Sequence, residues 1–195
     1  MDKLIAHRGI PSKFVKENSV VAIKKALLSN EFLGVEFDVR VTKDQEFIIY
    51  HDSYINNKLI KNMYYSELPK YVPRLSDVLN IKSDKIFLVE IKNIDGLYNE
   101  FVKLLNKYKN KNIYVMSFSN KVIEQLLSYK KTFKLGILNY VFNTNDSLYQ
   151  RLDFLCILNS LLNDHIISNY SDLEIFSYGI FSKKKYKDVY YIVDE

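Results

Sequence analysis

The sequence is poor in the residues that characterise cross-linked, fibrous and membrane-spanning proteins. Its 195 residues include one cysteine, five glycines, three prolines and no tryptophan. A single cysteine, Cys156, excludes an intramolecular disulfide framework and a zinc site made of several cysteines. The low glycine and proline content excludes a collagen-like or proline-rich chain. No run approaches the roughly 18 apolar residues that a membrane span requires.

The sequence also lacks a large excess of positive or negative charge. The chain has 28 Lys and Arg against 23 Asp and Glu, a net charge of +5, and its lysines are spread out, which argues against a nucleic-acid partner. The N-terminus lacks a charged leader followed by a long apolar segment, so we expect a cytoplasmic protein without a stable membrane anchor. With 48% hydrophobic residues, residues 1–195 are expected to form a single domain. Nothing in the sequence indicates its oligomeric state.

Short β-type runs alternate with amphipathic helical patterns along the whole chain. Nine runs rich in Ile, Val, Phe, Tyr and Leu have the composition of strands: 3–7, 35–39, 47–51, 86–91, 113–117, 134–138, 154–158, 173–177 and 190–193. Between them, apolar residues recur at helical spacing, as from Leu97 to Tyr108. Asn18 or Ser19 is suited to cap one helix and Ser119 another. This alternation predicts a parallel sheet built from βαβ units.

One connection is too short for that pattern. Only a few residues separate Val39 from Phe47, whereas a crossover between parallel strands needs about a dozen. We therefore expect an irregular or hairpin segment near residues 39–51. The remaining eight strands predict a compact (β/α)8 TIM barrel. Because only Asp194 and Glu195 follow the last expected strand, we also expect no closing C-terminal helix.

Three carboxylates are expected at one mouth of this barrel. Residues two apart on a strand share a face, so Glu36 lies beside Asp38, and Glu90 beside Lys92. The carboxyl ends of barrel strands carry active sites. Three converging carboxylates cannot all ionise without a compensating cation. Oxygen ligands favour Ca²⁺ or Mg²⁺, so we expect one divalent cation at this mouth.

Two histidines and two positively charged side chains lie at the same strand ends. His7 and His51 titrate near neutral pH and can act as general base and general acid. Arg8 and Lys92 are suited to bind a phosphate group. Together with a divalent cation, these residues indicate phosphodiester cleavage.

Six segments that carry these residues resemble, in order and spacing, the glycerophosphodiester phosphodiesterases, a family with a phospholipase-C-like barrel. They are Ala-His-Arg-Gly (6–9), Glu-Asn-Ser (17–19), Glu-Phe-Asp-Val (36–39), Thr-Lys-Asp (42–44), His-Asp (51–52) and Val-Glu-Ile-Lys (89–92). The resemblance is sharp over residues 4–92 and weaker beyond. It implies a hydrolase that converts glycerophosphodiesters to glycerol 3-phosphate and an alcohol. It implies that the two histidines are catalytic, that the three carboxylates bind the metal, and that Arg8 and Lys92 face the phosphate.

The sequence also departs from the family pattern. The short segment between His51 and Glu90 predicts a reduced lid over the mouth. Where the family has Trp-Thr-x-Asn, this chain has Phe-Ser-Tyr-Gly at 176–179, which predicts a substrate pocket unlike that of the family. We expect Phe118 and Phe176 to supply an apolar pocket wall instead.

Simpler roles and other functions remain open at this point. Asn18 is interpreted as a helix cap, Asp194 as a strand-end residue, and the Glu90–Lys92 pair is open to a purely structural reading. One alternative function is that of a lysophospholipase D or sphingomyelinase D relative, which would act on lysophospholipids. The other is a catalytically decayed barrel that serves as a binding module.

Overall fold

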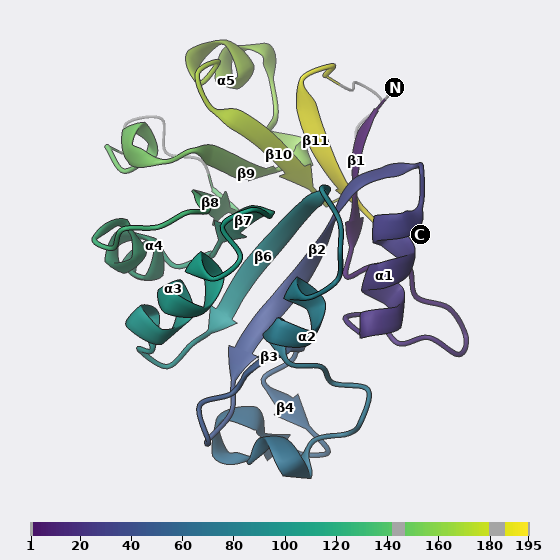
Figure 1. The fold of residues 1–195 in the computed structure, drawn as a ribbon. Coiled ribbons are helices and arrows are strands. Elements are labelled where there is room, and N and C mark those ends of the chain that lie inside the picture. The colour runs from purple at the N-terminus through teal and green to yellow at the C-terminus, as the bar shows by residue number, and fades with distance from the viewer. Residues whose placement is uncertain (1, 142–146, 180–185, 195) are drawn as a thin grey trace.

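Eight parallel strands close into a barrel (Figure 1). The computed structural model describes residues 2–141, 147–179 and 186–194. The barrel strands are β1 (Lys3–His7), β2 (Phe32–Val41), β6 (Ile86–Asn93), β7 (Asn112–Met116), β8 (Lys134–Asn139), β9 (Phe154–Leu158), β10 (Glu174–Tyr178) and β11 (Val189–Val193). Each strand pairs in parallel with the next, and β1 pairs with both β11 and β2, which closes the sheet. The predicted barrel is therefore confirmed.

The helices lie outside this barrel. They are α1 (Val20–Leu28), α2 (Leu75–Leu79), α3 (Tyr98–Asn106), α4 (Asn120–Leu127) and α5 (Asp164–Asn169). Ser19, not Asn18, caps α1 by accepting a hydrogen bond from the Ala22 backbone, and Ser119 caps α4 in the same way. The helices bury their apolar faces against the sheet, for example through Ile23 and Phe101. In the described part of the chain, no helix follows β11, and none is long and apolar enough to cross a membrane.

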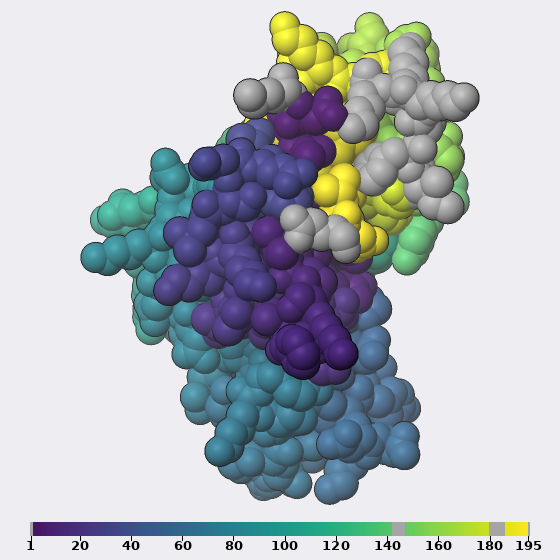
Figure 2. All heavy atoms as spheres, turned by 90° about the vertical axis from the view of Figure 1, so that its right-hand side faces the viewer, coloured from purple at the N-terminus to yellow at the C-terminus, as the bar shows by residue number. Residues whose placement is uncertain are grey.

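The predicted irregular segment is an antiparallel arm. Strand β3 (Phe47–Ile49) pairs antiparallel with the end of β2. The chain then forms a small hairpin, β4 (Tyr54–Ile55) and β5 (Lys58–Leu59), followed by two short 3₁₀-helices. Five apolar side chains give this segment a core of its own: Ile48, Ile55, Ile60, Met63 and Val72. The segment lies beyond the carboxyl ends of β2 and β6, and forms the blue end of the molecule in Figure 2.

The interior of the barrel is packed with aromatic rings rather than open. Tyr114, Phe154 and Phe176 meet edge to face, with ring centroids 5.1 to 5.4 Å apart. Phe176 also stacks on Tyr190. This packing fills the amino-terminal half of the barrel, so side chains at the carboxyl ends of the strands surround the space that is left.

Candidate active site

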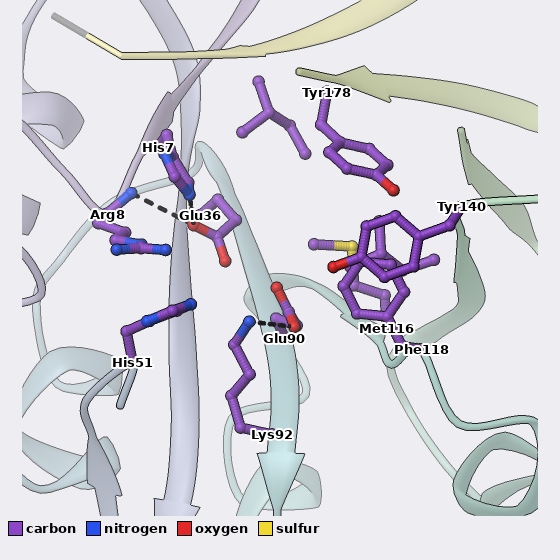
Figure 3. Close-up of a pocket in the computed structure, with 12 residues that line it drawn as sticks. His7, Arg8, Glu36, His51, Glu90, Lys92, Met116, Phe118, Tyr140 and Tyr178 are labelled. Carbon is purple, nitrogen blue, oxygen red and sulfur yellow. Dashed lines mark hydrogen bonds and ion pairs between the residues drawn. The ribbon is translucent and has the colours of Figure 1, made fainter. Parts of the chain in front are cut away.

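A pocket of about 210 Å³ opens at the carboxyl ends of the strands. One half is lined by polar residues from β1, β2, β6 and the arm: His7, Arg8, Glu36, His51, Glu90 and Lys92. The other half is lined by Met116, Phe118, Leu138, Tyr140, Tyr178 and Ile192. Figure 3 shows the two halves facing each other, with the histidines and Arg8 on one side and the aromatic rings on the other. The structure thus brings together six of the nine site residues predicted from the sequence on one half of the pocket, and Phe118 on the other.

The three predicted carboxylates converge beside this pocket. Asp38 is the direct neighbour of Glu90 in the parallel register of β2 and β6, and Glu36 lies on the same face of β2. Glu36 and Asp38 are each 1% exposed and Glu90 is 7% exposed. One carboxylate oxygen from each of the three lies within 4.8 Å of the other two. Two oxygens that bind the same Ca²⁺ at about 2.5 Å cannot be more than about 5 Å apart, so this spacing suits a shared cation.

The electrostatics of the cluster also suit a cation. Burial raises the pKa of Glu36 well above its ordinary value, and the neighbouring charges of Asp38 and Glu90 raise it further. Burial and Asp38 likewise raise the pKa of Glu90. Within the described residues, Oε1 of Glu36 is buried without a hydrogen-bond partner. These oxygen donors, with an excess of negative charge, fit a hard divalent cation.

Two positive side chains contact the cluster. Nζ of Lys92 lies 2.6 Å from Glu90 and 3.3 Å from Asp38. Nε of Arg8 lies 3.3 Å from Asp38, and its Nη1 donates to Glu17 at 2.9 Å. Burial lowers the pKa of each cation, but the carboxylates outweigh that effect and raise it above the ordinary value. Both side chains therefore remain charged at neutral pH.

Gly9 allows the backbone to turn directly after Arg8 and pass close to α1. Its φ is +86°, in the left-handed region that favours glycine. A Cβ atom at this position would lie 2.6 Å from the Ala22 carbonyl carbon of α1. Only glycine therefore fits between the end of β1 and the first turn of α1.

Each histidine has a carboxylate on one ring nitrogen. Nδ1 of His7 lies 2.5 Å from Asp194, and Nδ1 of His51 lies 2.8 Å from Asp52. The Nε2 atom of His7 lies 3.9 Å from Glu36. The guanidinium of Arg40 donates two hydrogen bonds to the His51 carbonyl, at 2.8 and 2.6 Å, and so fixes the end of the arm. From the sequence, Asp194 was predicted only to be a strand-end residue. Its contact with His7 was missed because the two residues lie at opposite ends of the chain.

Asn18 was expected to be a helix cap, but its side chain contacts Asp38 instead. Its Nδ2 donates to Oδ2 of Asp38 at 2.8 Å, and its Oδ1 accepts from the Asp38 backbone at 3.3 Å. Its φ of +58° is one that asparagine tolerates better than most residues. These contacts fix the orientation of the Asp38 carboxylate.

The apolar wall differs from the expectation at one position. Phe118 lines the pocket as expected, but Phe176 does not and is fully buried. Both Phe176 and Tyr178 point to the barrel interior from β10. Phe176 is one layer deeper, in the ring cluster with Tyr114, and Tyr178 reaches the pocket. Alternation along a strand indicates the face of a residue but not its depth in the barrel.

Comparison with known proteins agrees with this arrangement. Residues 7–157 match the model of the Glycerophosphoryl diester phosphodiesterase family. The chain belongs to this family. A glycerophosphodiester phosphodiesterase of Caldanaerobacter subterraneus is 27% identical over 161 residues, 69% of this chain and 65% of that protein. One of Bacillus altitudinis is 30% identical over 115 residues, 48% of this chain and 46% of its own. The chain thus spans less than two thirds of the length of these curated relatives.

Solved phosphodiesterase structures share the fold. A glycerophosphodiester phosphodiesterase of Thermotoga maritima has a TM-score of 0.77 at 21% identity, covering 100% of this chain and 94% of that one. An Oleispira antarctica phosphodiesterase in complex with the product sn-glycerol-3-phosphate has a TM-score of 0.75 at 17% identity, covering 92% of this chain and 85% of that one. The family match includes both histidines and all three carboxylates. Tyr178 and Asp194 lie beyond it.

Proposed function

We propose that this chain hydrolyses glycerophosphodiesters to glycerol 3-phosphate and an alcohol, with one divalent cation, Ca²⁺ or Mg²⁺, held by Glu36, Asp38 and Glu90. The observation that carries the proposal is the convergence of these buried carboxylates, two carboxylate-paired imidazoles and two cations on one pocket. Membership of the family supports the same chemistry. The glycerol 3-phosphate product in the Oleispira structure supports the substrate class.

In the proposed reaction, Arg8 and Lys92 bind the phosphodiester oxygens. One imidazole accepts a proton from the attacking hydroxyl, either of water or of the glycerol carbon beside the phosphate. The new oxygen–phosphorus bond displaces the alcohol, and the other imidazole donates a proton to the leaving oxygen. If the glycerol hydroxyl attacks, the cyclic phosphate is then opened by water. When bound, the divalent cation supplies Lewis-acid stabilisation of charge on the phosphate oxygens.

Asp194 and Asp52 have a supporting role in this proposal. A carboxylate on Nδ1 fixes the tautomer and ring orientation of a catalytic histidine. Each imidazole therefore presents Nε2 for proton transfer. The same carboxylates stabilise the imidazolium that forms during the reaction.

The test is an assay of glycerophosphocholine and glycerophosphoethanolamine with added Ca²⁺ or Mg²⁺, coupling released glycerol 3-phosphate to its dehydrogenase. We expect metal-dependent release that EDTA abolishes. His7→Ala and His51→Ala should each lower kcat by roughly 10²- to 10⁴-fold, the usual contribution of a general acid or base. His165→Ala is the matched control, because His165 lies on α5 and does not line the pocket.

Two results would contradict the proposal. Turnover that survives in both histidine variants would remove the acid–base roles. No release with either metal, from a folded protein, would favour the decayed barrel as a binding module.

A further inference from the structure

The apolar half of the pocket continues from the barrel interior to the solvent. Met116 and Leu138 are buried at its inner end. Phe118 comes next, with its ring stacked on Tyr140 at a centroid distance of 4.1 Å and an interplanar angle of 11°. Tyr140 is 64% exposed and the adjacent Val141 is 80% exposed. An apolar path therefore leads out of the pocket and over its rim.

Tyr178, from barrel strand β10, packs against both rings of this path. Its ring meets Phe118 edge to face at 6.1 Å and Tyr140 at 6.2 Å. Its hydroxyl donates to the Asn139 carbonyl at 3.0 Å. Burial raises the pKa of Tyr178, so the phenol stays neutral. The wall therefore presents ring faces and edges without a free charge.

Aromatic rings can also bind a quaternary ammonium group, but the Phe118 ring is already occupied by neighbouring side chains. The ammonium of Lys92 already lies 6.0 Å from the centre of the Phe118 ring. The stacked Tyr140 ring covers the Phe118 ring as well. None of the six residues on this half of the pocket is acidic. A choline group at this wall would compete with Lys92 and Tyr140 for the Phe118 ring, and the nearby Glu90 is already paired with Lys92. An uncharged chain needs only apolar contact.

We infer that the wall formed by Phe118, Tyr140 and Tyr178 binds an uncharged apolar chain on the phosphodiester. This inference rests on the proposed function and narrows its substrate class. The chain can come from an acyl group on the glycerol, as in a lysophospholipid, or from an alkyl leaving alcohol. In both cases water adds to phosphorus, the phosphorus–oxygen bond to the leaving alcohol breaks, and that alcohol takes up the proton.

Three water-soluble substrates test the inference and distinguish the two sources. They are glycerophosphocholine, 1-hexanoyl-lysophosphatidylcholine and glycerophosphohexanol, used as monomers with Ca²⁺ or Mg²⁺. The first two release choline and the third releases glycerol 3-phosphate. Burial of one methylene favours binding by about fourfold. We expect kcat/KM for at least one chain-bearing substrate to exceed that for glycerophosphocholine tenfold or more, with the gain mainly in KM.

Variants of the wall provide the second arm. In Tyr140→Ser, the ratio of kcat/KM for the preferred chain-bearing substrate to that for glycerophosphocholine should fall at least threefold, and Phe118→Ala should lower it further. Tyr140 is largely exposed, so its replacement should leave the fold intact. Tyr54→Ser is the control, since Tyr54 is an exposed tyrosine outside the pocket and should leave the ratio unchanged.

The outcomes separate this inference from the proposed function. Hydrolysis of glycerophosphocholine with no preference for either chain would overturn the inference and leave the proposed function standing. A preference that survives unchanged in both wall variants would also overturn it. If none of the three substrates is cleaved, the proposed function fails, and the inference fails with it.

Discussion

At the scale of single residues, the pairing of His7 with Asp194 links the two ends of the described chain. The 2.5 Å contact joins residues 187 positions apart. The Asp194 side chain is mostly exposed, so it contributes little to folding. If its role is to orient the imidazole, its loss should affect turnover more than stability.

Replacing Asp194 with Asn tests this role. We expect kcat to fall roughly 10- to 100-fold, because an amide can hold His7 in the wrong tautomer. KM and the thermal midpoint should change little, and Asp194→Glu should restore part of the activity. Asp188→Asn is the matched control, since Asp188 is an equally exposed carboxylate paired with Lys3. Equal kcat values for the Asn variant and the parent would exclude a positioning role.

The sequence predicted the site residues unevenly, and the reason is physical. His7, Glu36 and Glu90 could be placed because strand alternation and the order of the strands carry them to one mouth. Asn18 and Asp194 each contact a strand residue distant in sequence, which no local pattern reports. Phe176 was placed at the wrong depth. The functional roles of all these residues remain predictions.

At the scale of elements, the barrel strands were predicted well, whereas the two-residue strands and the shortest helices were not. Each of the nine expected runs overlaps an observed strand, and the connection that was too short for a crossover is the antiparallel pairing of β2 with β3. The β4–β5 hairpin, α2 and α5 were not predicted. Strands of two residues and helices of five or six residues show too little periodicity to be recognised, and packing against neighbours stabilises them.

Strands β7, β8 and β10 also share a polar cluster at their amino-terminal ends. The buried Tyr114 hydroxyl donates to Glu174 at 2.8 Å and accepts from Lys134 at 2.7 Å. Lys134 also forms an ion pair with Glu174. These contacts satisfy the polar groups next to the aromatic cluster that fills the barrel. We expect the cluster to stabilise the fold in a pH-dependent way.

The variant Tyr114→Phe tests that dependence. Burial raises the pKa of Tyr114 to about 12, above the roughly 10 of an unfolded tyrosine. A raised folded-state pKa means that the stabilisation is fully present below pH 10 and is lost as the pH rises toward 12. The variant should be less stable by about 1 kcal/mol at pH 8, and the difference should shrink between pH 10 and 12. Urea unfolding across this range measures it. A difference that stays constant would contradict the prediction, and Tyr54→Phe is the exposed control.

At the scale of the whole molecule, the barrel separates two tasks. Its amino-terminal half is packed with aromatic rings and closes the barrel. Its carboxyl half places three carboxylates, two imidazoles and two cations around one pocket. Such a concentration of charge is costly to bury, since each carboxylate must lose its hydration. The fold therefore has an electrostatic imbalance at one end that a ligand can relieve.

That imbalance predicts that a divalent cation stabilises the whole protein. Three carboxylates face the positive charges of Arg8 and Lys92, so the cluster carries one excess negative charge when all are ionised. Bound there, a divalent cation would reverse this to one positive charge, which the phosphodiester anion of the proposed reaction would neutralise. A cation at 100 times its Kd adds about 2.7 kcal/mol to the free energy of unfolding. For a chain of this size that is a rise of roughly 5 to 10 °C in the thermal midpoint.

Thermal unfolding with Ca²⁺ or Mg²⁺, against K⁺ at equal ionic strength, measures this effect without any turnover. Glu36→Gln should raise the stability of the metal-free protein, because it removes a buried charge, and should lower the gain from the divalent cation. Glu31→Gln, on the exposed surface between α1 and β2, should match the parent in both. An equal midpoint rise in the parent and in Glu36→Gln would place the cation elsewhere. No rise at millimolar Ca²⁺ or Mg²⁺ would contradict the prediction that these carboxylates bind a divalent cation.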